Sequence, residues 1–413
     1  MRVLLAFDKF KDSLTALEAC KLTAAVLRSR HGDWSLDLCP LADGGEGFAE
    51  ILTHAAGGTM TRLSVTGPRG NPIEAAFGLV SLGRIPPAAR SLLALDFPVP
   101  PRVTPGPSSP VPSPPQSAPR PSPLGGDAAV AVIEMASASG LALLAAELRD
   151  PWQTTTQGTG QLIRAAAEAG AAGVLLGVGG SATNDLGLGA LDALGLEFRT
   201  GTDEKKSPPF PADWAGITRI AGAVTGTIPP IRIACDVTNP LLGPNGAAAI
   251  YGPQKGLKPG DLRRIEHEAA RLALMLCSHC RQPDTLMDAP GAGAAGGLPF
   301  GLMTAARAKL LPGFDLVSAW LDLEAKIAAA DLVITGEGRF DESSLSGKGP
   351  GAVAARARAL GKPVHVFAGQ VTAAARDGLK LHPITPAGTP LPEALRDAGV
   401  NLTAAVQAAI GNL

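Results

Sequence analysis

The first 18 residues of the chain, MRVLLAFDKFKDSLTALE (residues 1–18), decide the fold class. Residues 3–7 form an unbroken apolar run with the length of a buried strand. Thr15 and Glu18 then make the S/T-x-x-E capping box that begins a helix, and apolar residues continue at helical spacing as far as Leu27. A buried strand followed directly by an amphipathic helix predicts the first unit of an α/β fold.

The same alternation continues along the chain. The expected strands are 3–7, 35–38, 59–65, 73–80, 128–134, 173–178, 231–235, 332–335 and 363–368, and the expected helices include 48–55, 160–169, 185–193, 261–277, 316–329 and 351–360. The turn at 67–72 is typical of a hairpin. We therefore expect a mostly parallel sheet, whose ligands bind beyond the carboxyl ends of its strands.

Composition narrows the function classes. A length of 413 residues suggests two domains, and 46% hydrophobic residues exclude wholesale disorder. With 36 basic and 37 acidic residues, the chain lacks the excess of positive charge that is typical of proteins binding nucleic acid or an anionic membrane. The five scattered cysteines do not make a disulfide scaffold, and the N-terminal apolar run stops too early for a signal peptide. We expect a cytoplasmic protein.

A proline-rich stretch interrupts the α/β pattern. Between residues 86 and 123 lie 14 of the 37 prolines, mixed with serine. Such a segment buries little apolar surface, so residues 86–125 are expected to be a disordered Pro/Ser-rich loop.

Charged residues follow the first expected strand. Asp8, Lys9 and Lys11 stand just before a capped helix, where a phosphate or carboxylate is favoured. A solvated surface loop explains these residues equally well.

Two carboxylates and three glycines follow the second strand. Asp43 and Glu46 are candidates for a magnesium ligand or a base, and Gly44 and Gly45 would bring backbone close to a ligand. One glycine is enough for an ordinary turn, so this segment favours a functional site.

The segment after the strand at 173–178 offers both donors and acceptors. The Gly179-Gly180-Ser181 turn presents amides to an anion, and Asn184 and Asp185 supply acceptors beside it. Helix capping would account for a serine or an asparagine here, but not for the glycines.

Polar residues after the strand at 231–235 allow two interpretations. Asp236 and Asn239 form an Asx-type turn or orient a substrate hydroxyl. Further on, residues 291–296 match G-x-G-x-x-G but do not follow a strand, so the dinucleotide context is missing. Gly293 still fits a loop facing a nucleotide.

The last such segment contains Glu337 and, further along, Lys348. It lacks Walker spacing, but acids, a lysine and glycines before a helix fit a phosphate–magnesium site. The sequence contains no convincing Ser–His–Asp set. We therefore expect a carboxylate to act as the general base. Gly-rich turns with carboxylates at one sheet edge suit phosphoryl transfer, in which positioning and charge neutralisation dominate.

Six motifs in this order strongly resemble the bacterial glycerate kinase type-1 family. The resemblance covers residues 1–380 and rests on Asp8-Lys9-Phe10-Lys11, Ala42-Asp43-Gly44-Gly45-Glu46-Gly47, Gly179-Gly180-Ser181-Ala182-Thr183-Asn184-Asp185, Cys235-Asp236-Val237-Thr238-Asn239-Pro240-Leu241, Gln254-Lys255-Gly256 and Thr335-Gly336-Glu337-Gly338-Arg339-Phe340-Asp341. Asp12 departs from the pattern, since the family commonly has glycine there.

The resemblance implies ATP-dependent phosphorylation of D-glycerate with Mg²⁺, usually at the 2-hydroxyl to give 2-phosphoglycerate. It also implies two unlike α/β domains, one inserted into the other, with the active site in the cleft. We therefore expect a Rossmann-like parallel-sheet domain from residues 1–62 and 291–413, and an inserted domain from residues 63–290.

Roles for the candidate residues complete this hypothesis. Lys11 and Lys348 meet the ATP phosphates, Asp43 or Glu46 holds the metal, and Asp185 takes the hydroxyl proton. The glycerate carboxylate meets the turn at 179–181, while Asp236 and Asn239 steady the diol. The nucleotide-side candidates are Asp8, Lys9, Gly44, Gly45, Gly293, Glu337 and Lys348.

Several alternatives stay open. Phosphorylation at the 3-hydroxyl or of a related small hydroxy acid would use the same site. A non-catalytic nucleotide-binding module or an NAD-dependent oxidoreductase are the alternatives from other classes. The expected partners are small molecules, without nucleic acid or membrane, and a homodimer is open.

Overall fold

The computed structural model describes residues 1–42, 44–95, 128–224, 228–342, 344, 349–374 and 378–410. Two candidate site residues, Asp43 and Lys348, lie outside these ranges, as does the part of the expected proline-rich loop from residue 96 onward. The remaining candidates can be placed.

The first sheet has five parallel strands in the order β14-β13-β12-β1-β2. The strands are β1 (Arg2–Phe7), β2 (Ser35–Leu38), β12 (Leu332–Phe340), β13 (Val364–Val371) and β14 (Leu379–Pro383). Helices α1 (Ala16–Arg30) and α14 (Ala398–Ile410) pack together on one face, while α11 (Leu323–Ala329) and α12 (Gly349–Ala359) cover the other. The predicted capping box begins α1, with both of its hydrogen bonds formed.

The second sheet has six strands in the order β11-β10-β6-β5-β4-β3. The strands are β3 (Thr59–Thr66), β4 (Pro72–Ser81), β5 (Ala129–Glu134), β6 (Ala171–Gly177), β10 (Ile231–Ala234) and β11 (Lys309–Leu311). Strands β3 and β4 form the predicted hairpin, and the pairs from β5 to β11 are parallel. The fold is therefore α/β with parallel-sheet domains, as the strand–helix alternation predicts.

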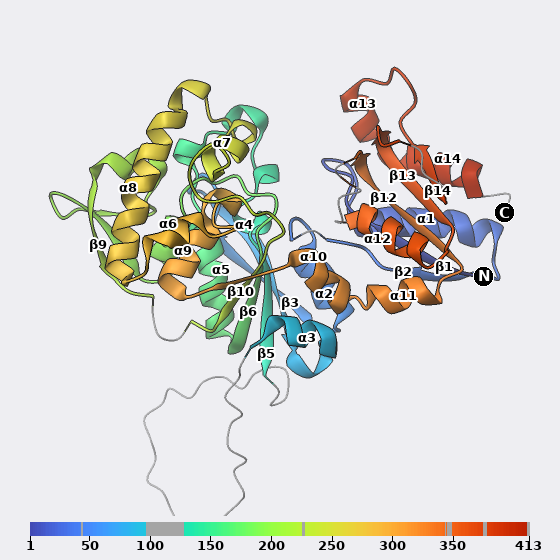
Figure 1. Ribbon diagram of the computed structural model, residues 1–413, viewed down its shortest axis with the longest axis horizontal. Coiled ribbons are helices and arrows are strands. Elements are labelled where there is room, and N and C mark those ends of the chain that lie inside the picture. Colours follow the sequence, from blue (N-terminus) through green and yellow to red (C-terminus); the bar gives the residue numbers. More distant parts are fainter. Residues whose placement is uncertain are drawn as a thin grey trace, which may run out of the picture.

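Helices cover both faces of the second sheet (Figure 1). On one face lies α5 (Gln157–Glu168), backed by α6 (Leu188–Ala193), α8 (Leu262–Cys280) and α9 (Leu298–Ala306); on the other lie α2 (Phe48–Ala55) and α10 (Gly313–Trp320). The remaining helices are α3 (Pro87–Leu93), α4 (Ala136–Ser139), α7 (Ala247–Tyr251) and α13 (Leu391–Arg396). Among the described residues, no helix combines the length and apolar character needed to cross a membrane.

The chain leaves the first sheet after β2 and returns to it at β12, so the second sheet is built from the intervening residues. Strand β3 begins at Thr59 and β11 ends at Leu311, so this sheet extends past the expected limits of 63 and 290 on both sides.

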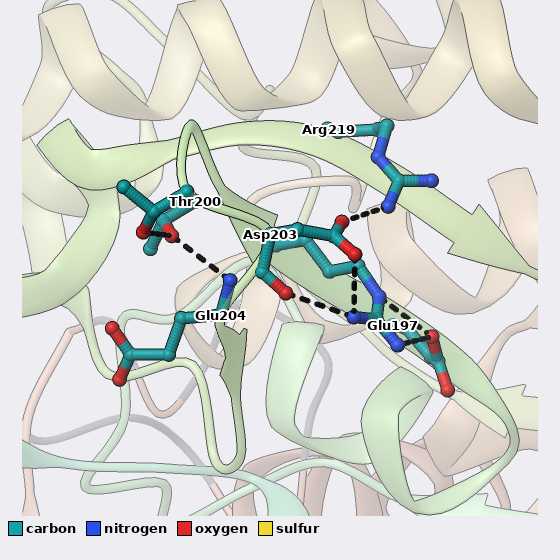
Figure 2. A network of polar contacts seen from close by, with 7 residues as sticks. Glu197, Thr200, Asp203, Glu204 and Arg219 are labelled. Atoms are coloured by element: carbon teal, nitrogen blue, oxygen red, sulfur yellow. Dashed lines mark hydrogen bonds and ion pairs between the residues drawn. The ribbon is translucent and has the colours of Figure 1, made fainter.

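A small third sheet in the order β8-β7-β9 consists of β7 (Leu196–Thr200), β8 (Lys205–Lys206) and β9 (Ile217–Gly222). Figure 2 shows its polar network, in which Arg199 donates to Glu197 at 2.7 Å and Arg219 pairs with Asp203. The guanidinium groups of Arg199 and Arg219 thus have carboxylate partners within this sheet.

The start of the expected disordered loop is in fact helical. Residues 87–93 form α3, whose Ala89 and Leu93 are completely buried. The buried guanidinium of Arg232 donates to the carbonyls of Leu93 and Ala94 at 2.7 and 2.6 Å, which satisfies the carboxyl end of the helix. Proline at the first helical position and buried apolar side chains explain why a proline-rich sequence is ordered here.

The expected helix at 316–329 is also different. It consists of two helices, α10 and α11, separated at Asp322, which adopts φ +53°. A residue in the left-handed region cannot continue an α-helix, so the chain changes direction there.

One hydrophobic core is shared by the two sheets. It contains side chains from β1, α11 and α12 of the first sheet together with side chains from β5, α2 and α10, including Leu4, Ala6, Leu52, Val130, Val132, Phe314, Leu323 and Val353. The indole of Trp320 in α10 donates to the carbonyl of Leu52 in α2 at 3.0 Å. Figure 1 shows α2 and α10 lying between the two lobes. The domains are thus joined by packed apolar surface.

Glycines bring the two domains into backbone contact above this core. The amide of Gly179, just after β6, donates to the carbonyl of Gly44 at 2.9 Å. A Cβ on Gly177 would lie 2.4 Å from that same carbonyl oxygen, and a Cβ on Gly179 would lie 2.7 Å from Gly45 Cα. Side chains at these positions would hold the two loops apart, so the glycines are a packing requirement.

The substitution Gly177→Ala tests this contact. We expect a loss of about 1–3 kcal/mol in the free energy of unfolding, because the added methyl group overlaps the Gly44 carbonyl and the Phe48 ring. Urea unfolding measures the loss. The matched control is Gly260→Ala, where a Cβ meets nothing within 4 Å and the change should stay within about 0.5 kcal/mol. Equal stability of the two variants would contradict the close contact.

Candidate active site

A cavity of about 360 Å³, which we call the junction pocket, opens where the carboxyl ends of β1, β6 and β10 meet. This volume is at the lower end of the range of about 300–1,000 Å³ found for ligand sites. Predicted site residues from four separate segments line it, namely Lys9, Lys11, Glu46, Gly179, Gly180, Ser181 and Asp236. The distant motifs therefore converge on one pocket.

The loop between β2 and α2 is fixed on this pocket by two carboxylates. Glu46 forms an ion pair with Lys9 at 3.5 Å, which links it to the loop after β1. Glu134, at the end of β5, accepts from the amide of Ala49 at 3.0 Å and so satisfies the start of α2. Burial raises the pKa of Glu134 to about 7, although its backbone hydrogen bonds and Lys9 oppose the shift.

A buried lysine lies under the Gly179–Ser181 turn. Lys255 is 1% exposed, and its Nζ donates to Ser181 Oγ at 2.8 Å and to the carbonyl of Thr183 at 2.6 Å. Burial lowers the pKa of Lys255 to about 7, with the charge of Asp185 opposing the shift. Lys255 belongs to the Gln254-Lys255-Gly256 motif, but its burial is not predictable, since a lysine in a Gly- and Pro-rich turn carries no signal of burial.

Asp185 lies beneath the pocket and does not line it. Its carboxylate is fully buried and accepts from Thr156 N at 2.7 Å, Thr156 Oγ1 at 2.8 Å, and the amides of Gly187 and Gly189 at 3.1 and 3.3 Å. Burial raises the pKa of Asp185, against these hydrogen bonds. Its described contacts tie the segment after β6 to the start of α5.

Asp236 and Asn239 differ in position. Asp236 lines the junction pocket, and its two carboxylate oxygens accept from the amide of Phe314 at 3.2 and 3.0 Å, at the start of α10. Asn239 does not line the pocket: its Oδ1 accepts from Tyr251 at 2.6 Å and its Nδ2 donates to the carbonyl of Asn245 at 2.8 Å. Asn239 therefore holds its own loop together and positions the only tyrosine, which does line the pocket.

Asn184 and Gly293 are buried behind the pocket. Asn184 is 2% exposed, and a Cβ on Gly293 would lie 2.0 Å from the carbonyl oxygen of Pro240. The G-x-G-x-x-G segment follows a 3₁₀ helix (Asp284–Asp288) and not a strand, so it lacks the setting of a dinucleotide-binding loop. Its glycines allow close packing of loops.

Two further candidates lie together at the carboxyl edge of the first sheet. The amide of Asp8 donates to the carbonyl of Gly336 at 2.9 Å, which places Asp8 next to Glu337 on the neighbouring strand. A Cβ on Gly349, the first residue of α12, would lie 3.5 Å from Asp8 Oδ2. This edge therefore combines two carboxylates with a helix N-terminus.

A larger cavity of about 880 Å³ adjoins the junction pocket. It shares Lys9, Lys11, Asp12 and Glu46 with that pocket, and its other lining residues include the N-terminal part of α1, several residues of α2, and residues 320–322. The lysines thus stand where two cavities meet.

The donor set can be compared with what Mg²⁺ requires. Within the described ranges, no three His, Cys, Asp or Glu side chains form a group that could hold a metal ion. Mg²⁺ at kinase sites usually takes one or two carboxylates, with substrate phosphates and water completing the shell. Glu46 satisfies that smaller requirement, so the residues fit a phosphate-bound Mg²⁺ and not an all-protein cage.

The fold and the pocket together define a class of protein. Two α/β domains meet at the carboxyl ends of parallel strands, and the pocket between them combines lysines, carboxylates and a glycine turn. This is the arrangement of a two-domain enzyme that acts on small anionic substrates between its domains.

Comparisons with known proteins identify the family. The family model described as "Glycerate kinase family" matches residues 3–90 and 118–412, and it leaves unmatched a segment within the proline-rich stretch. The chain is 36% identical to a glycerate kinase of Bacillus subtilis over 409 residues, covering 96% of this chain and 94% of that protein. It is 35% identical to the glycerate 2-kinase of Escherichia coli over 380 residues, covering 90% and 86%.

A solved structure agrees with this result. The crystal structure of a protein from Salmonella typhimurium LT2, assigned as glycerate kinase 2, superposes with a TM-score of 0.71 at 34% identity, covering 99% of this chain and 96% of that one. The chain therefore belongs to the glycerate kinase family, as its motifs suggested, and it is an enzyme that phosphorylates glycerate.

The buried position of Lys255 predicts a pH-dependent stability. An unfolded lysine keeps its ordinary pKa of 10.5, whereas the folded side chain loses its proton near pH 7. Between these values the unfolded state binds more protons, so stability rises with pH. From pH 7 to 8.5 the wild-type free energy of unfolding should increase by about 1.5 kcal/mol relative to Lys255→Met.

Urea unfolding at the two pH values measures this difference. The control variant is Lys258→Met, which removes an exposed lysine three residues away and should show the same pH dependence as the wild type. Parallel pH profiles for wild type and Lys255→Met would mean that Lys255 keeps its ordinary pKa in the folded protein.

Proposed function

We propose that the protein transfers a phosphoryl group from ATP to the 2-hydroxyl of D-glycerate, giving 2-phosphoglycerate and ADP. The observation that carries the proposal is the junction pocket, where Lys9 and Lys11 face the Gly179–Ser181 turn and Asp236 across the domain boundary. Membership of the glycerate kinase family supports the acceptor, and the name of the E. coli relative, glycerate 2-kinase, supports the 2-position.

The nucleotide would bind on the side of the first sheet. Asp8, Glu337 and the N-terminus of α12 lie at its carboxyl edge, and Lys9 and Lys11 stand between this edge and the junction pocket. Lysines neutralise phosphate charge, and free amides at a helix N-terminus favour an anion. We include Lys348 in this group from its place just before α12 in the sequence.

Glycerate would occupy the junction pocket with its carboxylate toward the Gly179–Ser181 turn. The attacking hydroxyl oxygen forms a bond to the γ-phosphorus, the bond to the β–γ bridging oxygen breaks, and the hydroxyl proton passes to a carboxylate. We assign that proton to Asp236, which lines the pocket, because a base must lie within hydrogen-bond reach of the hydroxyl.

Asp185 takes a different role from the one expected from sequence. A fully buried carboxylate with four donors around it has no access to substrate in this structure. We propose that Asp185 positions the loop that carries the Gly179–Ser181 turn, and that Lys255 supports the turn from below.

Mg²⁺ would be held by Glu46 together with the phosphates, and we retain Asp43, with Gly44 and Gly45 beside it, in that group from sequence alone. When bound, the ion would neutralise charge on the transferred phosphoryl group. We further propose that the enzyme acts in the cytoplasm on two small molecules, D-glycerate and ATP. The proposal holds for a monomer and for a homodimer.

A coupled assay of ADP formation tests the function. Purified protein with D-glycerate, ATP and Mg²⁺ should form ADP, and ³¹P and ¹³C spectra should show the phosphate on carbon 2. Phosphate on carbon 3 would overturn the assigned position, and ATP binding without turnover would overturn the catalytic proposal.

The two aspartates should respond differently to substitution by asparagine. Asp236→Asn removes the proton acceptor but keeps an oxygen for the Phe314 amide, so kcat should fall about 10²–10⁴-fold with little change in melting temperature. Asp185→Asn places an NH₂ group among four donors, and should lower the free energy of unfolding by about 1–3 kcal/mol. Steady-state kinetics and thermal unfolding of both variants check the assignment. A large kcat loss in Asp185→Asn at unchanged stability, with normal turnover in Asp236→Asn, would restore Asp185 as the base.

A further inference from the structure

Arg149 is a cation of the junction pocket that neither the motifs nor the family comparison singles out. It lies between two 3₁₀ helices, Ala146–Leu148 and Pro151–Gln153, and it lines the pocket. In the described part of the chain its guanidinium makes no hydrogen bond or ion pair, and its Nε atom is completely buried without an acceptor. A guanidinium that lines a pocket without a protein acceptor can take its acceptor from a bound ligand.

The backbone around Arg149 is fixed by close contacts. Gly256, at φ +92°, packs so tightly that a Cβ there would lie 2.1 Å from the Arg149 carbonyl oxygen. On the other side, Asp150 Oδ1 accepts from the amide of Trp152 at 3.0 Å and begins the next helical turn. The arginine is therefore attached to a rigid backbone, which reduces the entropy lost on binding a ligand.

The cations of the pocket divide by domain. Lys9 and Lys11 belong to the loop after β1, which packs over Gly338 of the first sheet, and Lys9 is already paired with Glu46. Arg149 belongs to the second domain, whose other pocket-lining residues include Ser181, Tyr251 and Gln254. A substrate held between the domains would thus meet lysines on one side and an arginine on the other.

The chemistry of the guanidinium indicates which anion it takes. Its planar fork matches the two oxygens of a carboxylate, while lysine acts as a point charge suited to phosphate. Building on the proposed function, we infer that Arg149 binds the carboxylate of glycerate, from the opposite domain to the lysines, and so makes the enzyme selective for a hydroxy acid over an uncharged polyol.

The test compares D-glycerate with its uncharged amide as phosphoryl acceptor for wild type, Arg149→Met and Arg149→Lys. In Arg149→Met the KM for D-glycerate should rise about 10- to 100-fold, because a charge-assisted pair is lost, while the KM for ATP stays within about twofold. In Arg149→Lys the increase should be smaller, since the charge remains but the fork is lost. The kcat/KM for the amide should be unchanged in both variants. The ratio of kcat/KM for the acid to kcat/KM for the amide should therefore fall by the same factor by which the KM for D-glycerate rises.

The control is Arg263→Met, which removes an exposed arginine of α8 and should leave all constants as in the wild type. A merely structural role of Arg149 would lower kcat/KM for acid and amide together, and a phosphate-binding role would raise the KM for ATP; either result overturns the inference. Failure of the wild type to phosphorylate D-glycerate would instead overturn the proposed function. If the wild type is active and Arg149→Met keeps its KM for glycerate, the function stands and Arg149 is excluded.

Discussion

The backbone contact between Gly44 and Gly179 is the constraint on which the site depends. The hydrogen bond of 2.9 Å joins the loop before α2 to the turn after β6, and it places Glu46 and the Gly179–Ser181 turn on one pocket. Below it, the core shared by the two sheets fixes how the domains pack. A polar site that needs groups from two domains is thereby assembled on rigid elements, which is what accurate positioning of two substrates requires.

Charge is distributed in two layers around this contact. The charged residues that line the pocket include Lys9, Lys11, Glu46, Asp236 and Arg149. Behind it, Lys255 and Asp185 are buried, and their hydrogen bonds support the turn that faces the pocket. Burial lowers the pKa of Lys255 and raises that of Asp185, so both shifts weaken the charged forms. Lys255 and Asp185 therefore contribute to the site through the hydrogen bonds that hold the Gly179–Ser181 turn and the segment after it.

The sequence predicts much of this arrangement, because strand–helix alternation and polar turns after strands are local signals. All the strands expected from apolar runs are present. Strands β8 and β11 have only two and three residues, too few for a recognisable apolar run, and charged residues interrupt β7, β9 and β14. The motifs locate the pocket, but they do not show which of their residues are buried. Asp185 and Asn239 are predicted from sequence to contact the substrate because aspartate and asparagine are common at such sites. In the folded protein, Asp185 instead accepts from Thr156 and Asn239 accepts from Tyr251. At Asp12 the structure explains a feature of the sequence. The residue has φ +61°, in the left-handed region that glycine reaches without steric cost, which is why the family commonly has glycine there.

A crystal structure with D-glycerate and a non-hydrolysable ATP analogue is the most direct test of an active site shared between the domains. We expect glycerate in the junction pocket, with its carboxylate between Arg149 and the Gly179–Ser181 turn, and the terminal phosphate of the nucleotide against Lys9 and Lys11. Glycerate bound within one domain only, or in the larger cavity away from Asp236, would contradict the account.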